Sequence, residues 1–536
     1  MPATDSYASG PAEPAIQDLT IGALLQDGAV AVPDRLALVT GTTDPAASRS
    51  WTYAELYQDS LRTAHALRAR FEPGEHVAIW APNVPEWILT EFGCAMAGIV
   101  LVTANPSFQA GELEYVINQS KSVGLLVLPE FRGNNMLATV EAIRSNCPTL
   151  REVIRLDEWD EFLDSASESD VELPEVLPAD AVMIQYTSGT TGFPKGALLH
   201  HRGLVNNGAH TMDRMGVEDG AVWMAMMPLF HTAGCAVGVL GAVSKRATQV
   251  LMEAFDPGLA LELIETHRAT ALLGVPTMLI AILEHPSFAT RDLTSLRSIC
   301  SGGSTVPAAL VEQLEADLGA PFTIVFGQTE CSPVAAMTST DDSAEDKANT
   351  LGTPMPHTEI KIVDPDTGAT VPFNTAGDLC TRGYHVMLGY FEMPEATASA
   401  IDSDGWLHTG DLCSMDERGY CRVQGRLNDM IIRGGENVYP REIEELLFRH
   451  PQVAEVAVVG LPDPKWGENV AAFIRDADPI NPASDTELRE YCREHLSAQK
   501  TPKIWVRVAE FPLTGSGKIQ KFVLREQWES ARVNER

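Results

Sequence analysis

Short apolar runs alternate with helix-like patterns along most of the chain, and this alternation constrains the fold more than any other feature of the sequence. The run His76–Trp80 is typical of a strand, Pro85–Ala97 of a helix, and Ile99–Thr103 of a second strand. Strands that alternate with helices favour parallel pairing, because each helix carries the chain back to the edge where the next strand begins. We therefore expect parallel sheets covered by helices.

The middle of the chain repeats this arrangement. Strands are predicted at Thr248–Met252 and Ala271–Val275. Between them, Asp256 is a candidate N-cap and Pro257 suits the first turn of a helix that runs to His267. The predicted fold class is α/β, with a large N-terminal body of layered α/β subdomains.

Two smaller units are expected after the layered body. Turn signals at Asp364–Gly368 and Asp402–Gly405 lie between short β-like runs and predict a small β subdomain. A cluster of Gly and Arg at 425–435 is followed by a compact set of helix and strand patterns that begins with the helix Pro440–His450.

These patterns predict two domains. Residues 1–425 form the N-terminal body, and residues 426–536 form a small, mobile α+β domain. The chain's first segment, up to about residue 20, is rich in Ala, Pro, Ser and Gly, and we expect it to be a loose arm with little function.

Composition and charge exclude several classes of function. The 536 residues are 45% hydrophobic and 21% charged, so the chain can bury more than one core and is too long for a single small binding module. A formal net charge of −34 repels a nucleic-acid backbone and an anionic lipid surface, so we expect no nucleic-acid partner. No pattern in the sequence indicates an oligomeric state.

The nine cysteines include no CxxC pair and no Cys/His spacing typical of zinc, so neither a disulfide framework nor a structural metal is expected. The first residues lack the basic start and apolar core of a signal peptide, and no apolar run is long enough to span a bilayer. A cytoplasmic location without integral membrane association is therefore predicted.

A candidate phosphate loop, YTSGTTGFPKG, spans residues 186–196 and follows the apolar strand Ala181–Ile184. Glycines let the backbone approach an anion, the amides and hydroxyls supply donors, and a lysine adds positive charge. The GxxxxGK[ST] spacing of a Walker A loop is absent, and an ordinary Gly/Ser/Thr surface loop is the alternative. The predicted phosphate-binding residues are Thr187, Ser188, Gly189, Thr190, Thr191, Gly192 and Lys195.

This segment resembles the signature loop of the adenylate-forming superfamily, which includes acyl-CoA synthetases, adenylation domains of peptide synthetases and beetle luciferases. Further motifs of that superfamily follow in the expected order over nearly the whole chain. The resemblance implies an enzyme that uses ATP and Mg²⁺ to convert a carboxylic acid to an acyl-adenylate, and then transfers the acyl group to a thiol, that of CoA.

The resemblance also implies a nucleotide site. Thr329 would donate to the α-phosphate, Glu330 would hold the magnesium ion, and the carboxylate of Asp411 would accept from both ribose hydroxyls beside Arg426. Without the accompanying motifs, each of these would be read as a turn or a surface charge. The remaining nucleotide-binding candidates are Gly302, Gly303, Ser304, Phe326, Gly327, Gln328 and Val423.

The main catalytic candidate is Lys518, a glycine-flanked lysine in PLTGSGK whose ammonium would stabilise the two anions that meet in adenylation. By resemblance, Gly434, Gly435 and Glu436 line the tunnel through which the CoA thiol arrives. One site cannot present both groups at once, so we predict a rotation of the small domain between the two steps. The hinge position carries Asn428 where relatives often have Lys or Asp.

The segment MPLFHTAGC, residues 227–235, is expected to border the acyl pocket. His231 is a candidate gate for the carboxylate, with a satisfied core histidine as the equal alternative. In peptide-synthetase relatives an Asp near this place binds the amino group of an amino acid. Here His231 stands in that neighbourhood, followed by small, mostly apolar residues, so an amino acid is disfavoured as substrate. The acyl-pocket candidates are His231, Gly234, Cys235, Val237, Gly238, Gly302 and Cys331.

Whole-chain similarity, most visible in GQTECSPV and IIRGGENVYPREIEELL, is greatest to the medium-chain fatty-acyl branch of the superfamily. An aromatic acid as substrate, and a carrier-protein phosphopantetheine in place of CoA, remain open. A luciferase-like oxygenase and an inactive nucleotide-binding regulator are two further candidate functions. The joint presence of Lys195, Glu330, Asp411, Arg426 and Lys518 argues against the regulator.

Overall fold

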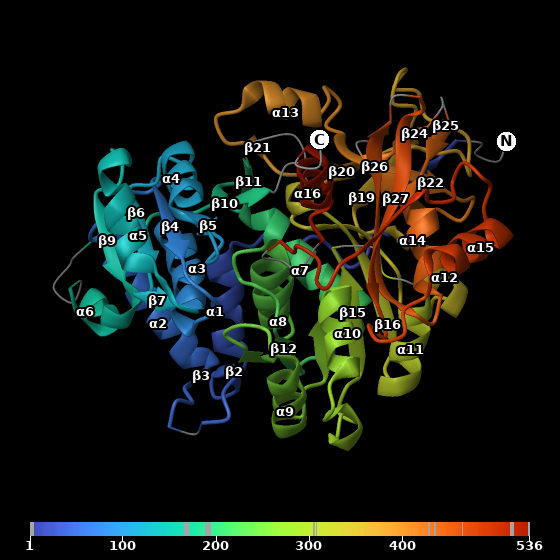
Figure 1. Ribbon diagram of the computed structural model, residues 1–536. Coiled ribbons are helices and arrows are strands. Elements are labelled where there is room, and N and C mark those ends of the chain that lie inside the picture. Colours follow the sequence, from blue (N-terminus) through green and yellow to red (C-terminus); the bar gives the residue numbers. More distant parts are fainter. Residues whose placement is uncertain are drawn as a thin grey trace.

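The computed structural model describes residues 5–44, 46–165, 171–187, 194–303, 306, 308–426, 429–433, 436–463, 465–514 and 519–533. Figure 1 shows most of the blue and cyan first part of the chain on the left, with the N-terminus at the far right, the green and yellow middle part at the centre, and the red C-terminal unit at the upper right. The predicted α/β class, with a large N-terminal body and a small C-terminal unit, is confirmed.

The first sheet is largely parallel and is buried on both faces. On β4, Val77 and Ile79 belong to one core while Ala78 and Trp80 belong to another, because successive side chains of a strand point to opposite faces. In spatial order its strands are β21 (Gly389–Tyr390), β11 (Lys195–His200), β10 (Ala181–Thr187), β5 (Val100–Ala104), β4 (His76–Trp80), β6 (Gly124–Val127) and β9 (Glu152–Arg155).

The second sheet has the same two-sided burial, and it shares one core with the first. On β12, Trp223 and Ala225 face the shared core, whereas Met224 faces a core on the far side. In spatial order its strands are β18 (Thr353–Pro354), β17 (Val334–Met337), β16 (Phe322–Gly327), β15 (Ser298–Gly302), β14 (Ala271–Leu273), β12 (Val222–Ala225), β13 (Thr248–Leu251), β2 (Leu36–Thr40) and β3 (Ser50–Thr52).

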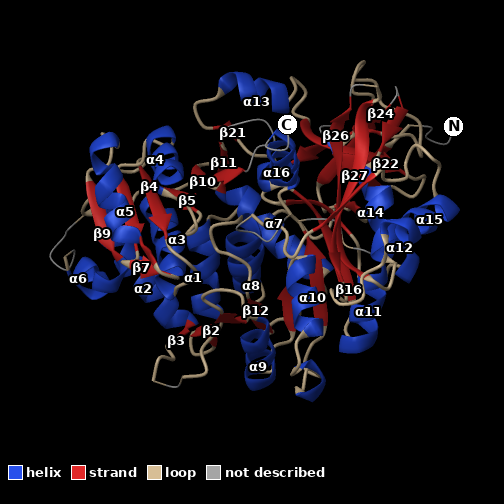
Figure 2. Cartoon of the chain, viewed as in Figure 1, coloured by secondary structure: helices blue, strands red, loops and turns tan. Residues whose placement is uncertain are grey.

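Helices pack between the two sheets and on their outer faces, as Figure 2 shows by colour. The inner helices that supply the shared core are α1 (Ile21–Ala31), α2 (Tyr53–Arg68), α3 (Pro85–Ala97), α7 (His201–Arg214), the π-helix Ala233–Leu240 and α8 (Gly241–Ser244). The outer helices are α4 (Ala110–Gln119) and α5 (Met136–Ile143) on the first sheet, and α9 (Pro257–His267), α10 (Pro276–Glu284) and α11 (Ala308–Leu318) on the second.

Several predicted helix and strand boundaries are confirmed. Strand β4 and helix α3 begin and end at the predicted residues. Helix α9 starts on Pro257, and the side chain of Asp256 accepts from the backbone N–H of Leu259, as expected of an N-cap. Peripheral elements complete this part of the chain: β7 (Glu130–Phe131), β8 (Asn134–Asn135), α6 (Trp159–Asp164) and α13 (Pro394–Ala400).

The predicted β subdomain is present as a third sheet, and it corrects the prediction for the N-terminal arm. Its strand order is β1 (Tyr7–Ser9), β19 (Thr358–Val363), β20 (Gly377–Gly383), β22 (Leu407–Met415) and β23 (Cys421–Arg426). The arm is therefore an ordered edge strand over Tyr7–Ser9, and further on the amide N–H of Gln17 donates to Asn206 Oδ1 at 2.7 Å. Composition missed this, because backbone pairing at an edge needs no distinctive side chain.

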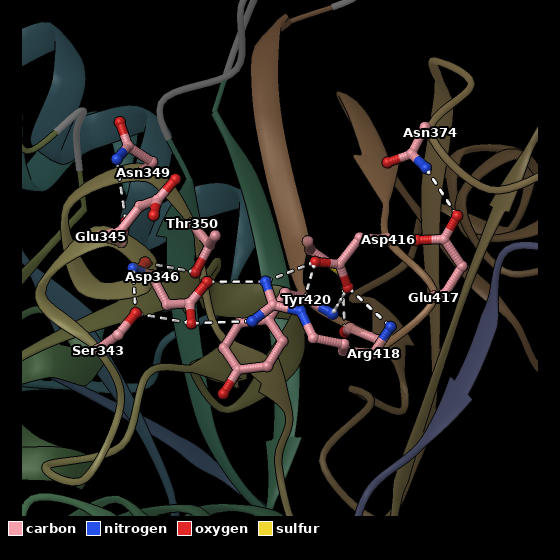
Figure 3. Close-up of polar contacts among 12 residues, drawn as sticks. Ser343, Glu345, Asp346, Asn349, Thr350, Asn374, Asp416, Glu417, Arg418 and Tyr420 are labelled. Atoms are coloured by element: carbon pink, nitrogen blue, oxygen red, sulfur yellow. Dashed lines mark hydrogen bonds and ion pairs between the residues drawn. The ribbon is translucent and has the colours of Figure 1, made fainter.

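Arg418 fastens the turn between β22 and β23 to helix α12 (Ala344–Asn349). Its guanidinium donates to both carboxylate oxygens of Asp346, at 2.8 and 2.9 Å, and also to Asp416 within the turn (Figure 3). Paired Arg–carboxylate contacts fix geometry as well as charge. The Arg418 guanidinium is accordingly the first cause that lowers the pKa of Asp346.

The C-terminal unit is a sheet with a core on each face. Ala472 and Ile474 face one core, and Ala471 and Phe473 the other. Its strands are β24 (Ile431–Arg433), β25 (Glu436–Val438), β26 (Val453–Asp463), β27 (Gly467–Asp476) and β28 (Ile504–Arg507), and its helices are α14 (Pro440–Phe448), α15 (Asp485–His495) and α16 (Lys521–Val533).

Within the described ranges, no strand before residue 427 pairs with a strand after residue 428. The predicted domain boundary stays a prediction, as does the mobility of the smaller unit. Across the described part of the chain, no helix combines the length and the apolar character needed to pass through a bilayer.

Candidate functional site

The candidate site gathers at strand ends, where a doubly covered sheet leaves its backbone and side chains accessible. Strand β10 ends at Thr187 and strand β11 begins at Lys195, and these two residues are opposite each other in the antiparallel ladder. Residues 188–193 of the predicted loop, which comprise Ser188, Gly189, Thr190, Thr191 and Gly192, lie outside the described residues. The ladder therefore holds the two ends of the loop together.

Tyr390 connects the loop lysine to the predicted magnesium ligand. Its hydroxyl donates to Glu330 Oε1 at 2.7 Å, and the Lys195 ammonium lies 5.0 Å from the centre of its ring. Tyr390 reaches this place because β21 pairs with β11, with Tyr390 opposite Ala197. Burial, and then the charge of Glu330, raise the pKa of the Tyr390 hydroxyl, so it stays a proton donor.

The segment that carries Thr329 and Glu330 is held by close backbone packing. Both residues are 6% exposed and lie in a short 3₁₀ turn directly after β16. A Cβ on Gly327 would lie 1.9 Å from the carbonyl oxygen of Pro333, so only glycine fits there. The Glu330 carbonyl also accepts from the Met387 N–H at 2.9 Å, which anchors the turn beside Tyr390.

The predicted adenine segment lies on the neighbouring strand. Strand β15 ends at Gly302, which pairs with Val325 of β16, and a Cβ on Gly302 would lie 2.4 Å from the Val325 carbonyl oxygen. Gly303 is exposed and has a φ of +78°, which favours glycine. Phe326 and Gln328 are half-buried at the end of β16, and Ser304 lies outside the described residues.

The two predicted ribose-binding residues lie opposite each other. Asp411 of β22 and Arg426 of β23 are partners in the antiparallel ladder, although the side chain of Arg426 lies outside what the structure describes. Asp411 is 6% exposed, and Gly410 before it has a φ of +71°. Burial, and then the charges of Glu330 and Asp411, raise the pKa of the Cys331 thiol. Both carboxylates therefore act on this one thiol.

The N–H of Gly410 donates to Asp378 Oδ1 at 3.0 Å, which fixes the irregular part of β22 that carries Asp411. This supporting role of Asp378 was missed at the sequence level, as was the role of Tyr390. For Tyr390 the signal is the LGYF segment, which has no chemistry of its own until β21 pairs with β11.

Only some of the residues predicted to be functional in the small domain lie in the described part of the chain. Lys518, Asn428, Gly434 and Gly435 lie outside the described residues, and Glu436 is described as the first residue of β25 without its side chain. The carbonyl of half-buried Val423 accepts from Arg441 Nη1 at 3.0 Å, a contact between β23 and α14. The predicted lysine loop is flanked by a β-bridge between Leu513 and Ile519.

Most of the predicted acyl-pocket residues lie in and before the π-helix Ala233–Leu240, whereas Gly302 ends β15 and Cys331 lies in the 3₁₀ turn after β16. Gly234 must be glycine, because a Cβ there would lie 2.1 Å from the Pro228 carbonyl oxygen, whereas Gly238 would meet only ordinary contacts. The Nδ1 of half-buried His231 accepts from the Ala233 N–H at 3.2 Å. Among the remaining pocket candidates, Cys235, Val237 and Cys331 are buried in the shared core.

Gln185 connects this segment to the central strand β10, because its side-chain Nε2 donates to Cys235 Sγ at 3.0 Å. Asn83 fixes the backbone that precedes the π-helix. Its side-chain Oδ1 accepts from the Leu229 N–H at 2.8 Å, and its Nδ2 donates to the Met227 carbonyl at 3.0 Å. The sequence argument did not single out Gln185 or Asn83, since isolated amides carry no recognisable pattern.

Largely parallel sheets covered by helices, with a predicted anion loop between β10 and β11 and a buried carboxylate after β16, are typical of a nucleotide-dependent enzyme of the α/β class. The chain belongs to the AMP-binding enzyme family: the family's profile matches residues 25–391, and the profile of the AMP-binding enzyme C-terminal domain matches residues 442–518. The resemblance to adenylate-forming enzymes is thereby confirmed.

Named relatives match nearly end to end. The putative acyl-CoA synthetase YngI of Bacillus subtilis (strain 168) is 41% identical over 95% of this chain and 97% of the relative. The human mitochondrial medium-chain acyl-CoA ligase ACSF2 is 36% identical over 98% of this chain and 90% of the relative.

Among solved structures, ATP-bound MatB from Rhodopseudomonas palustris has a TM-score of 0.86 at 29% identity, covering 96% of this chain and 99% of that one. The Mycobacterium tuberculosis fatty acyl CoA synthetase has a TM-score of 0.74 at 30% identity, with the same coverage.

Proposed function

We propose that this chain is an AMP-forming acyl-CoA synthetase. In the first step an oxygen of the acid attacks the α-phosphorus of ATP and the bond to the β-phosphate breaks, which gives acyl-AMP and pyrophosphate. In the second step the sulfur of CoA attacks the acyl carbonyl, the thiol proton is released, and AMP leaves. The relatives named as acyl-CoA synthetases or ligases support this activity.

The contact of Tyr390 with both Glu330 and Lys195 is the single observation that carries the proposal. It brings a buried carboxylate and an ammonium from distant parts of the sequence together beside the ends of β10 and β11, between which the predicted phosphate loop lies. A triphosphate needs such a mixture, because cations balance its charge while a fixed carboxylate orients the accompanying metal. Each residue by itself would be compatible with an ordinary surface loop.

Magnesium suits this donor set. Mg²⁺ takes oxygen ligands and retains several waters, so one protein carboxylate suffices beside the phosphates, and Glu330 Oε1 is already oriented by the hydroxyl of Tyr390. We propose that Glu330 holds the ion. When bound, Mg²⁺ would neutralise charge on the phosphates.

We propose that the small domain rotates about Asn428 between the steps, with Lys518 serving adenylation and Gly434, Gly435 and Glu436 serving CoA. MatB supports such rearrangement within the family. Its ATP-bound structure matches this chain with a TM-score of 0.86 and its apo structure with 0.76, at equal coverage of this chain. The Arg441–Val423 contact would have to break or shift when the domain turns, because it joins the two units.

A medium-chain fatty acid is the proposed substrate class. The buried, mostly apolar side chains of Cys235, Val237 and Cys331 support an apolar acyl group rather than an amino acid. An aromatic acid is the second candidate, favoured by the anthranilate CoA ligase AuaEII, which has a TM-score of 0.85 at 26% identity to this chain.

A cytoplasmic location is also proposed. All nine cysteines are free and buried, which suits a reducing compartment. Fractionation of the native cells tests it: recovery in an organelle or in an extracellular fraction would contradict the proposal. The human relative's name places that protein in mitochondria.

The deciding experiment is acid-dependent ATP–pyrophosphate exchange with a series of fatty and aromatic acids, followed by assay of AMP and thioester with free CoA. We expect exchange with medium-chain fatty acids and CoA-dependent thioester. Exchange without any thioester would favour a carrier-protein acceptor, and light emission with luciferin would indicate an oxygenase. A chain that binds ATP but supports no exchange with any acid would be an inactive regulator. Glu330→Gln is the matched variant for the proposed magnesium ligand, because it removes the carboxylate charge while keeping the shape of the side chain.

A further inference from the structure

Three potential metal ligands converge on neighbouring strands of the third sheet. Asp378 and Cys380 lie on β20, His408 lies on β22, and Cys380 and His408 are partners in the ladder. His408 Nδ1 lies 2.8 Å from Asp378 Oδ2 and 3.3 Å from Cys380 Sγ, and Cys380 Sγ lies 3.8 Å from Asp378 Oδ2. Thiol, imidazole and carboxylate therefore meet at one point.

These separations suit a tetrahedral metal ion. Zinc binds nitrogen and oxygen at about 2.0–2.2 Å and sulfur at about 2.3 Å, so ligand atoms at tetrahedral angles stand roughly 3.3–3.6 Å apart. Of the three observed distances, 2.8 Å lies below that range, 3.3 Å within it and 3.8 Å above it, so shifts of about half an ångström or less would close the set around an ion. In the absence of an ion the same atoms interact by hydrogen bonds, so the cluster is satisfied in either state.

The surroundings of His408 also suit a metal ligand. Its second ring nitrogen, Nε2, lies 3.7 Å from Asp402 Oδ2, and a ligating histidine commonly directs its remaining nitrogen to a carboxylate. The His408 side chain is 32% exposed, which leaves a path from solvent to a cluster whose two further members are buried. An ion could therefore enter without unfolding the sheet.

The charge balance favours a cation. Asp378 and Asp402 supply negative charge, and Lys361, opposite Cys380 on β19, opposes them. The Lys361 ammonium, which lies 4.3 Å from the centre of the Trp406 ring, offsets only one of these two carboxylate charges.

We propose that Asp378 Oδ2, Cys380 Sγ and His408 Nδ1 form a binding site for Zn²⁺ or a similarly thiophilic divalent cation, with water as the fourth ligand. Binding displaces the thiol proton of Cys380 and any proton on His408 Nδ1, and both leave to solvent. This site is separate from the proposed magnesium site, which offers oxygen donors that suit a hard cation.

The site is connected to the nucleotide pocket. Asp378 uses Oδ2 in the cluster and Oδ1 to accept from the N–H of Gly410, next to Asp411. An ion on Oδ2 therefore acts on the same carboxylate that fixes the part of β22 with the predicted ribose-binding Asp411. Because coupling between two sites is reciprocal, nucleotide binding would change metal affinity by the factor by which the metal changes nucleotide affinity.

The test is titration of the chelator-treated full chain with Co²⁺ in the absence of nucleotide. We expect one equivalent to produce a cobalt–thiolate charge-transfer band with the visible bands of tetrahedral cobalt, both displaced by one equivalent of Zn²⁺. The oxygen-only site at Glu330 cannot give a thiolate band. Failure of the wild-type chain to give such a band would overturn the proposal.

Variants identify the ligands. Cys380→Ser should abolish the thiolate band, whereas Cys421→Ser, an equally buried thiol on β23, should retain it. His408→Gln, at a partly exposed side chain, keeps the test decisive if the serine variant does not fold, and should abolish stoichiometric binding. Asp402→Asn should weaken cobalt binding by about 10- to 100-fold, as is typical of a group behind a metal ligand. A band that persists unchanged in either Cys380→Ser or His408→Gln contradicts the assignment.

Discussion

The hydroxyl of Tyr390 donates a 2.7 Å hydrogen bond to the carboxylate of Glu330. This contact joins β21, the edge strand of the first sheet that pairs with the phosphate-loop hairpin, to the turn that follows β16 in the second sheet. The two large sheets are thus connected directly at the candidate site. Placement of the Glu330 carboxylate therefore involves Tyr390 as well as the turn that carries it.

Tyr390→Phe should lower the rate of adenylation without unfolding the chain. The ring remains beneath Lys195, while Glu330 loses a hydrogen bond to a charged group, an interaction of about 1.5–3 kcal/mol, so we expect kcat/KM to fall about 10- to 100-fold. ATP–pyrophosphate exchange measured over a range of Mg²⁺ concentrations provides the readout. A higher Mg²⁺ requirement is expected, because Glu330 is less well oriented.

Tyr420→Phe is the matched control for this variant. Its hydroxyl also donates to a carboxylate, Asp342 Oδ1 at 2.6 Å, but at the far end of the β22–β23 hairpin. Exchange activity and Mg²⁺ dependence should be unchanged in it. Equal losses in both variants would mean that a general effect on stability, rather than the orientation of Glu330, explains the result.

Gly327→Ala should disrupt both the turn and the activity. Its Cβ would lie 1.9 Å from the Pro333 carbonyl oxygen, a backbone atom that cannot swing away as a side chain does. We expect a loss of about 1–3 kcal/mol in the free energy of unfolding, as is typical of overpacked sites, together with loss of exchange. Urea titration and the exchange assay measure the two effects.

Gly111→Ala provides the comparison for Gly327→Ala. A Cβ at Gly111 meets no atom within 4 Å, and the residue lies in helix α4, so alanine should be neutral or stabilise by up to about 1 kcal/mol. If Gly327→Ala behaved like this variant, close packing would not be what holds Thr329 and Glu330 in place.

Local patterns predicted the elements of the fold well, because the signals are local. Pro257 after Asp256 specifies the start of α9 whatever surrounds it. By contrast, the pairing of Cys380 with His408 depends on the register of β20 and β22, which no spacing in the sequence reveals. A search for metal-type spacing therefore missed the cluster.

The residues of the candidate site fall into the same two groups: those that a local pattern predicts, and those that only the pairing of distant strands brings into position. Residues inside motifs, such as Glu330 and Asp411, were predicted from the sequence and stay predictions, and the structure brings Asp411 opposite Arg426. Residues that act by supporting their neighbours were missed. Tyr390 and Asp378 belong to no recognised motif. They contact Glu330 and Gly410 only because strands that are distant in the sequence pair.

Lys518→Ala should separate the two half-reactions. Removal of an ammonium that stabilises charge in the transition state should slow acyl-AMP formation by about 10²–10³-fold, while thioester formation from supplied acyl-AMP and CoA continues near the wild-type rate. Single-turnover assays of each step measure this. If both steps fell together, the proposed division of labour within the small domain would be wrong.

Glu91→Gln should remove a pH-dependent loss of stability. Glu91 lies in α3 with 1% exposure, and neither carboxylate oxygen finds a hydrogen-bond partner among the described residues. Burial raises the pKa of this carboxyl well above its usual range. The folded state therefore holds a proton that the unfolded chain releases above the ordinary carboxyl pKa, so stability falls as pH rises from that value toward the folded pKa, by about 1.4 kcal/mol per pH unit.

Urea titrations of wild type and Glu91→Gln at about pH 5 and about pH 8 measure this loss, since Gln cannot ionise and all the remaining titrating groups are common to both chains. We expect the variant to gain in relative stability as the pH rises. Glu55→Gln is the control: Glu55 is exposed at the start of α2, where the backbone N–H of Thr52 lowers its pKa, so its difference from wild type should be flat over this range. A flat difference for Glu91→Gln as well would mean that Glu91 ionises in the folded chain, and an oxygen that ionises inside this core must be paired with water or a cation between α3 and its neighbours.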